Sequence, residues 1–296
     1  MCGILGVKIN KVSEKVPKNL LRIFKNQKDR GTDGAGLSLL RDGQLTRIRT
    51  ADPFDLFSFE YGKFWNTLQK GDCILVHHRF PTNGGDGNSL RSNHPFANED
   101  NKCHLIHNGV VSNDDKLFKQ LRKQGHRFES KVEGSITDSE VLVHMVEKDA
   151  KGGCQRIVDK AQGSIAIAFQ YANDNKIYLW RRTNPIEVYS DKGGNQYFSS
   201  EFPEGKGFTK IQELGEHKLY ALGDGLKVVH KYKKPKVEKY QGWTYTQMDE
   251  DDVAWWKRFN KGRNKDQRLD NDEDIENSLY EKEKSQYDRF GFRRMN

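Results

Sequence analysis

A cysteine occupies the second position of the chain, directly after Met1. An initiator methionine is commonly removed when a small residue follows it, and its removal here would leave a thiol and an α-amine on one residue. The α-amine has a pKa of about 8, so part of it is unprotonated at neutral pH and can take the thiol proton. Cys2 is therefore a candidate nucleophile that carries its own general base.

The other three cysteines do not suggest chemistry. Cys73, Cys103 and Cys154 form no Cys-x-x-Cys pair, and their wide spacing does not match a zinc pattern. The chain is also too long for a small disulfide scaffold. Because Cys73 and Cys103 lie in apolar, strand-like runs, we expect them to be inert core thiols.

The first 145 positions contain six short blocks rich in polar residues and glycine. They are MCGILG at the start, RGTDGAG at 30–36, HHRFPTNG at 77–84, NHPF at 93–96, HNGVVSN at 107–113 and TDSEVLVH at 137–144. In this order and spacing they resemble the glutaminase domain of class II glutamine amidotransferases, as in glucosamine phosphate synthase and phosphoribosylpyrophosphate amidotransferase. The resemblance implies that Cys2 attacks the side-chain amide of L-glutamine through a thioester, releasing glutamate and ammonia.

Asn108 and Gly109 are the candidate oxyanion donors. Acyl transfer from an amide needs N–H groups aimed at the developing negative charge. Asn108 can supply a side-chain N–H and Gly109 a backbone N–H beside it, and the resemblance gives these two residues that role. Taken alone, an Asn-Gly pair is more typical of a plain turn.

The resemblance also implies groups for both ends of a free amino acid. Arg79 would hold the α-carboxylate, with Thr82 adding a hydroxyl, and Asp138 would pair with the α-ammonium. Phe80 would stack against the glutamine or help close the site. The alternatives are an ordinary strand-end arginine at position 79 and a helix-capping aspartate at 138, and Asp138 could do both jobs.

Four further residues are expected to support the site. The resemblance assigns base catalysis to the amine of Cys2, so His77 and His107 (and His94) would act through hydrogen bonds. Arg30 would position the N-terminal residue, although Thr32 and Gly34 depart from the family's usual Tyr and Ser in that block. We expect no metal and no cofactor at this site; a metal bound by His77, His78 and His107 is a minor alternative.

The elements that must position these residues are mostly strands. Apolar runs predict strands at 3–9, 73–77 and 104–107, and Asp42-Gly43 predicts a hairpin between 37–40 and 45–48. Helices are expected at 17–30, from Asn113 to 124 and at 138–148, followed by short strands at 164–169, 176–180, 187–189 and 196–199. We expect an α+β fold, and the resemblance specifies a four-layer αββα sandwich of two stacked, mostly antiparallel sheets, the N-terminal-nucleophile hydrolase type.

Composition separates residues 2–233, the expected glutaminase domain, from a charged C-terminal extension at 234–296. The extension mixes both charge signs, and a short helix at 249–259 would carry Trp255 and Trp256. We expect it to be partly helical or disordered, and it would either dock a partner or only aid solubility.

The whole chain has 50 basic and 42 acidic residues, a net charge of +8, which fits a solvated surface better than a nucleic-acid site. The chain has no apolar run of 18 residues and no secretory signal, so we expect a cytoplasmic protein that does not enter membranes.

No segment after residue 225 is long enough for a known ammonia-using synthase domain. The favoured hypothesis is therefore a glutaminase subunit that passes ammonia to a separate synthase protein. Two alternatives remain: an N-terminal-nucleophile amidase acting on a different amide, and a non-catalytic binding module that kept the fold.

Overall fold

The computed structural model describes residues 2–27, 34–79, 90–130, 136–203 and 207–234. Apart from Lys234, the predicted C-terminal extension lies outside these residues, as do the tryptophans assigned to it. Among the described residues, no helix combines the length and apolar character needed to cross a bilayer.

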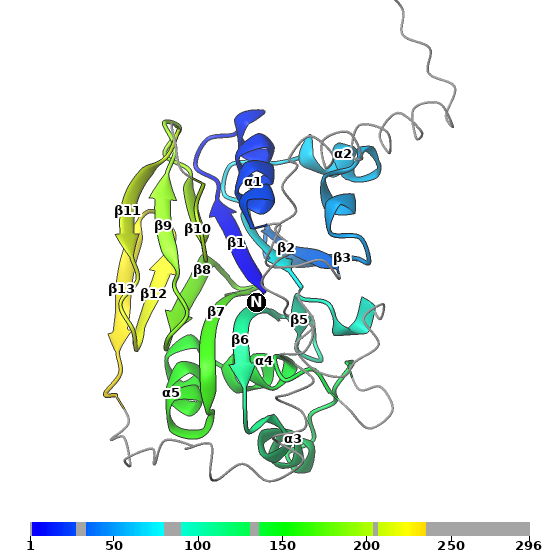
Figure 1. Cartoon of the computed structure of the whole chain (residues 1–296), viewed down its shortest axis with the longest axis vertical. Coiled ribbons are helices and arrows are strands. Elements are labelled where there is room, and N and C mark those ends of the chain that lie inside the picture. The colour runs from blue at the N-terminus through cyan, green and yellow to red at the C-terminus, as the bar shows by residue number, and fades with distance from the viewer. Residues whose placement is uncertain (1, 28–33, 80–89, 131–135, 204–206, 235–296) are drawn as a thin grey trace, which may run out of the picture. The chain divides into compact units, whose positions relative to one another are not determined.

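Two antiparallel sheets form the centre of the described domain (Figure 1). Within the described residues, the first sheet has seven strands in the order β11 (Thr209–Glu213), β9 (Glu187–Ser190), β10 (Gln196–Ser199), β1 (Gly3–Lys8), β4 (Cys73–His78), β2 (Ala35–Arg41) and β3 (Gln44–Thr50). The second has six strands in the order β13 (Leu226–Lys231), β12 (Lys218–Leu222), β8 (Asp174–Arg181), β7 (Gly163–Tyr171), β6 (Cys103–Val111) and β5 (Phe96–Ala97).

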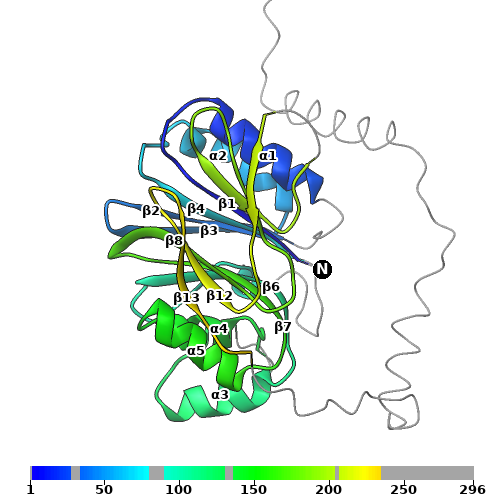
Figure 2. The same ribbon diagram turned by 90° about the vertical axis from the view of Figure 1, so that its left-hand side faces the viewer.

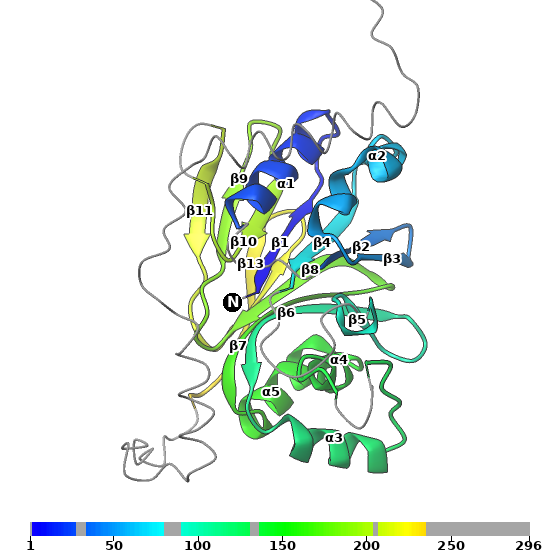
Figure 3. The same cartoon turned by 45° about the vertical axis from the view of Figure 1, so that its right-hand side comes forward.

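Helices cover the outer face of each sheet (Figure 2). On the first sheet lie α1 (Lys15–Asn26) and α2 (Phe59–Trp65), with 3-10 helices at Pro53–Phe57 and Leu90–Ser92 in the connections. On the second lie α3 (Asp114–Lys123), α4 (Glu140–Val146) and α5 (Ala150–Lys160), gathered beside β6 and β7 in Figure 3. The predicted four-layer α+β sandwich is confirmed.

The apolar residues of the described domain divide into layers as the strand period of two requires. In β1, Ile4 packs between the sheets, whereas Leu5 and Val7 pack under α1. In β6, Ile106 faces the other sheet and Leu105 faces the helices. This alternation matters for function because it directs Asn108, two positions beyond Ile106, into the space between the sheets.

Most predicted elements are present, with two kinds of error. The Asp42-Gly43 hairpin is confirmed, with positive φ angles of 47° and 76° at the two turn residues. The helix expected at 138–148 is shorter, because it begins at Glu140 with Ser139 as its N-cap. Helices α2 and α5 and strands β5 and β11 to β13 were not predicted. Helix α5 contains Gly152 and Gly153, which disfavour a helix, yet a Cβ at Gly153 would lie 2.6 Å from Val146 Cα.

Candidate active site

The N-terminal strand β1 runs through the middle of the first sheet, and its first residue, Gly3, follows the candidate nucleophile Cys2. Gly3 pairs with His78 of β4, so the same antiparallel register places Cys2 opposite Arg79. The backbone N–H of Arg79 donates to the carbonyl of Gly34 over 2.8 Å, at the start of β2. Cys2, Gly34 and Arg79 come from three segments distant in sequence and therefore lie together at the same end of the neighbouring strands β1, β2 and β4.

Close packing fixes the first residues of β1. A Cβ at Gly3 would lie 2.2 Å from Oε1 of Gln27, so only glycine allows this approach. The fully buried amide of Gln27 donates to the carbonyl of Glu201 over 3.2 Å and also to the hydroxyl of Ser199. Gln27 thus packs against the residue after Cys2 and is hydrogen-bonded to the end of β10, so the candidate nucleophile lies next to a closely packed strand.

Ser200 connects this strand to the second sheet. Its hydroxyl accepts a hydrogen bond from the backbone N–H of Ile4 over 3.2 Å and another from Nδ2 of Asn108, also over 3.2 Å. The backbone N–H of Ser200 donates to the carbonyl of Ile4 over 2.9 Å. Sequence analysis missed Ser200, because nothing in its neighbourhood distinguishes it from any serine after a strand.

Asn108 and Gly109 lie inside β6, so the turn alternative is wrong. Asn108 is 1% exposed, and its backbone carbonyl accepts from Nδ2 of Asn184 over 2.9 Å. Gly109 has a φ of 145°, and a Cβ there would lie 1.9 Å from the carbonyl oxygen of Ser164. The pair is therefore a constrained strand segment. Nδ2 of Asn108 carries two hydrogens, and Ser200 accepts one of them.

Asp138 anchors β6 rather than capping α4. Its Oδ2 accepts from the backbone N–H of Val111 over 2.7 Å, and its Oδ1 accepts from the hydroxyl of Ser139 over 3.1 Å. The hydroxyl oxygen of Ser139 also lies 2.9 Å from Nδ1 of His107. The predicted capping role of Asp138 is wrong, because the N-cap is Ser139 and it makes no side-chain cap bond. The half-buried carboxylate therefore lies beside the strand segment that follows Asn108 and Gly109, although Asp138 is about 30 positions further along the chain.

The histidines form a buried layer beside these residues. Nε2 of His77 donates to the carbonyl of His107 over 3.0 Å, and the ring of His77 stacks on that of His94 at 3.8 Å between centroids. Burial lowers the pKa of His77 and His94 well below the usual range, and it also lowers the pKa of His107. These imidazoles are therefore neutral at pH 7, and the contacts fit supporting residues.

Unpaired buried polar atoms concentrate around the same layer. Within the described residues, Oδ1 of Asn108, Nδ1 of His77, Nε2 of His107 and both ring nitrogens of His94 are buried without a hydrogen-bond partner. Buried polar atoms are normally satisfied, so a group of unsatisfied ones marks a place built for something other than packing.

Arg79 follows β4 directly and is 6% exposed. Its Nη1 donates to Oδ1 of Asn93 over 3.4 Å, and Nδ2 of Asn93 donates to the carbonyl of Thr50 over 2.9 Å. Asn93, from the NHPF block, therefore helps to orient the predicted carboxylate-binding arginine. The predicted residues Arg30, Phe80 and Thr82 lie outside the described residues.

Cys73 and Cys103 are buried, as predicted, and Cys154 is buried too. Burial raises the pKa of the Cys73 thiol to about 11 and also raises the pKa of the Cys103 and Cys154 thiols well above the ordinary value. A thiol with so high a pKa is not a nucleophile at neutral pH. Cys2 is partly exposed, in contrast to these three.

Comparison with known proteins points to one family. Residues 87–204 match the model of the glutamine amidotransferase domain. The glutamine–fructose-6-phosphate aminotransferase (isomerizing) of Thermococcus kodakarensis is 30% identical over 234 residues, which cover 76% of this chain and 35% of that enzyme. The corresponding enzyme of Sulfolobus acidocaldarius is 27% identical over 218 residues, 71% of this chain and 35% of the relative. The chain thus matches about a third of the length of these relatives.

Solved structures agree on the fold. The glutamine phosphoribosylpyrophosphate amidotransferase of B. subtilis superposes with a TM-score of 0.58 at 20% identity, covering 77% of this chain and 48% of that one. At this identity the similarity establishes the architecture of two stacked sheets and does not by itself establish a reaction.

Proposed function

The chain carries a class II glutamine amidotransferase domain of the N-terminal-nucleophile type, and from this premise we propose that it hydrolyses the side-chain amide of L-glutamine. One observation carries the proposal furthest. Ser200 links β1, which follows Cys2, to the amide of Asn108, so the candidate nucleophile and the candidate oxyanion donor belong to one hydrogen-bonded unit.

In the proposed reaction, the α-amine of Cys2 takes the thiol proton and Sγ attacks the amide carbon. Nδ2 of Asn108 and the backbone N–H of Gly109 stabilise the negative oxygen of the tetrahedral intermediate. The C–N bond breaks, and the nitrogen leaves as ammonia with the proton returned by the amine, which leaves a thioester on Cys2. Water then adds to the thioester and the C–S bond breaks. Glutamate is released, and the Cys2 thiol is regenerated.

Recognition of glutamine would use charges at the same edge of the domain. Arg79 is assigned to the α-carboxylate, because Asn93 holds its guanidinium and because the register places it opposite Cys2. Asp138 is assigned to the α-ammonium, with its orientation fixed by Val111 and Ser139. Thr82 and Phe80 complete the proposed pocket, and Arg30 the support of the N-terminal residue.

We further propose that the ammonia passes to a separate synthase protein in the cytoplasm, where the four thiols would stay reduced. The C-terminal extension, with Trp255 and Trp256 as anchors, would dock this partner. Deletion of residues 241–296 tests the docking role. Unchanged binding to a co-purifying synthase would remove it, while glutaminase activity should survive the deletion.

The glutaminase proposal itself is tested on the purified chain. Intact-mass measurement should show that Met1 is absent, and a chloroketone analogue of glutamine should label Cys2. Cys2→Ala should lose labelling and ammonia release, whereas Cys73→Ala, which removes a buried thiol of raised pKa, should keep both. Retained Met1 together with no ammonia release from glutamine would falsify the catalytic proposal and favour a binding module.

A further inference from the structure

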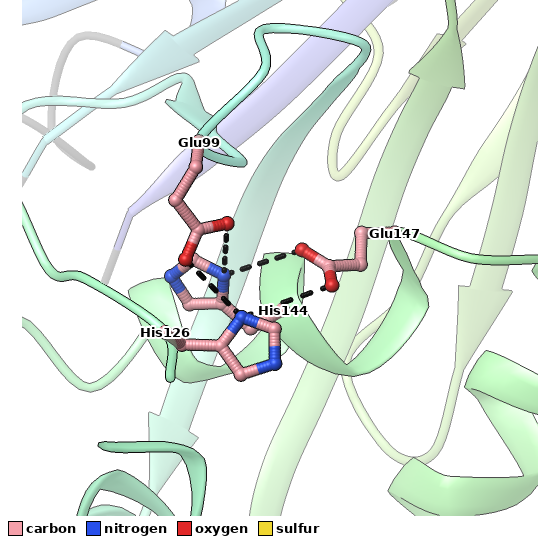
Figure 4. Close-up of side chains that lie close together, drawn as sticks. All are labelled: Glu99, His126, His144 and Glu147. Carbon is pink, nitrogen blue, oxygen red and sulfur yellow. Dashed lines mark hydrogen bonds and ion pairs between the residues drawn. The ribbon is translucent and has the colours of Figure 1, made fainter. Parts of the chain in front are cut away.

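Two glutamates and two histidines converge at the end of α4, away from the residues proposed for catalysis (Figure 4). They are Glu99 in the turn between β5 and β6, His126 in the loop after α3, His144 in α4 and Glu147 at its C-cap. One nitrogen or oxygen atom from each lies within 4.8 Å of all the others. Three separate segments of the chain thus contribute to one polar cluster.

The atoms of the cluster alternate between nitrogen and oxygen. Nδ1 of His126 lies 3.2 Å from Oε1 of Glu99 and 3.7 Å from Oε1 of Glu147. Nδ1 of His144 lies 3.6 Å from Oε2 of Glu99 and 3.4 Å from Oε2 of Glu147. Each imidazole nitrogen therefore faces one oxygen of each carboxylate, as the dashed lines in Figure 4 show.

Each imidazole makes one hydrogen bond in the cluster, Nδ1 of His126 to Oε1 of Glu99 and Nδ1 of His144 to Oε2 of Glu147, and these two bonds do not use the second carboxylate beside each nitrogen. The Nδ1–H of a neutral imidazole can donate along one direction, yet each Nδ1 here faces oxygens of two different glutamates. Four tetrahedral ligand atoms at about 2.1 Å from a zinc ion are about 3.4 Å apart. The nitrogen–oxygen distances here, 3.2–3.7 Å, are of that size but involve both oxygens of each glutamate, so one oxygen of each would turn toward the ion. A cation at the centre would satisfy all four groups, and two carboxylates with two neutral imidazoles would balance its double positive charge.

The surroundings hold the ligands in place. Oε1 of Glu99 accepts the backbone N–H of Arg127 over 2.8 Å. The ring of His144, whose side chain is 1% exposed, packs against Phe128 at 4.8 Å between centroids. His144 and Glu147 are three positions apart on one face of α4, so the helix itself sets their spacing. Glu99 also lines a cleft of about 330 Å³, whereas the other three residues of the cluster do not line it.

We propose that Glu99, His126, His144 and Glu147 bind one divalent cation of the zinc type. The two nitrogen ligands disfavour calcium and magnesium, which prefer oxygen ligands throughout. Because the protein supplies all four ligands, the site is closed and structural rather than catalytic. The ion fastens the end of α4 to the turn before β6 and to the loop after α3. Sequence analysis missed it, because the four residues fit no metal-ligand spacing.

The test uses the full chain with Cys2→Ala, which removes the one partly exposed thiol as a competing ligand. After treatment with a chelator, zinc chloride is titrated in and bound metal is measured by calorimetry and elemental analysis. We expect one ion per chain, a higher melting temperature with zinc, and a tetrahedral absorption spectrum when cobalt replaces zinc. None of these measurements depends on glutamine hydrolysis, so the outcome is separate from that of the proposed function.

His126→Gln and Glu99→Gln are the informative variants, because both side chains are more exposed than His144 and each variant should still fold. Each should weaken zinc binding at least about 10-fold and lose the rise in melting temperature. The matched controls are His230→Gln on β13 and Glu14→Gln on an exposed site before α1, and both should bind zinc as before. Absence of zinc binding to the parent chain, or equal affinity in all four variants, would overturn the proposal.

Discussion

The hydroxyl oxygen of Ser200 lies 3.2 Å from Nδ2 of Asn108, although Ser200 follows a strand of the first sheet and Asn108 lies in the second. The same oxygen accepts the backbone N–H of Ile4. One buried hydroxyl therefore fixes the distance between the strand that carries the candidate nucleophile and the candidate oxyanion donor.

Ser200→Ala is expected to leave two buried donors without an acceptor. Loss of such a partner costs about 1–3 kcal/mol, so the free energy of unfolding should fall by this amount in urea denaturation. Because Asn108 would lose its orientation, kcat for glutamine should fall about 10-fold or more, with little change in KM. Ser13→Ala, at an exposed position before α1, is the control. Equal kcat in the two variants would show that Ser200 does not position Asn108.

Asp138 can be separated into a structural and a recognition role by two substitutions. Asp138→Asn keeps an oxygen that can accept from Val111 but removes the charge, whereas Asp138→Ala removes both. We expect Asp138→Asn to raise KM for glutamine more than for an amide without an α-ammonium, while its unfolding free energy stays near that of the wild type. Asp138→Ala should in addition unfold at lower urea concentration. If Asp138→Asn affects both amides equally, Asp138 serves only to hold β6.

Gly109→Ala is expected to be among the most damaging single-methyl changes in the domain. The added Cβ would collide with the carbonyl of Ser164 at 1.9 Å, and alanine disfavours a φ of 145°. Together these effects should cost about 3 kcal/mol or more. Gly225→Ala is a matched control, because its φ is 155° but a Cβ there meets nothing within 4 Å. Thermal and urea unfolding should show a clearly larger loss at position 109, and equal losses would contradict the role of the collision.

Stability should fall in mild acid because of His104. Burial between the sheets lowers its pKa to about 3, while the unfolded chain titrates near the ordinary value of about 6.5. The folded state therefore keeps His104 neutral, and its contribution is complete above pH 6.5 and is lost as the pH falls toward 3. A proton that the unfolded chain binds and the folded chain does not lowers the free energy of unfolding by about 1.4 kcal/mol for each pH unit of acidification.

His104→Gln tests this pH dependence, because glutamine does not titrate and can still reach Ser38 or Asn101, the two partners of the imidazole. Urea denaturation at several values between pH 7.5 and 5 should give a shallower loss of stability than in the wild type. Parallel curves for the two proteins would mean that His104 is not the group that takes up the proton.

Local patterns predicted the parts of the fold that local chemistry decides. The Asp42-Gly43 hairpin and strand β1 follow from turn preference and apolar runs. Helix α5 could not be predicted, because Gly153 is favoured by its close packing on Val146 of α4 rather than by helix propensity. Asp138 has the residue type of an N-cap, and only the fold shows that Val111 is its partner instead.

The candidate site was predictable where the six blocks resemble a family and unpredictable where contacts are distant. Asn108 and Gly109 were identified from the blocks, but their constrained strand geometry was not. Ser200, Asn93 and the cluster around His144 depend on residues that only the folded chain brings together.

The central place of β1 has a consequence for the order of events during synthesis. Ile4 and Ser200, which hold each other across β1 and β10, are 196 positions apart, so this strand leaves the ribosome early and gains its last neighbour late. At about 5–20 residues per second, translation alone keeps the amino end waiting for about 10–40 s. The proposed removal of Met1 would have this interval in which to occur, before β10 pairs with β1.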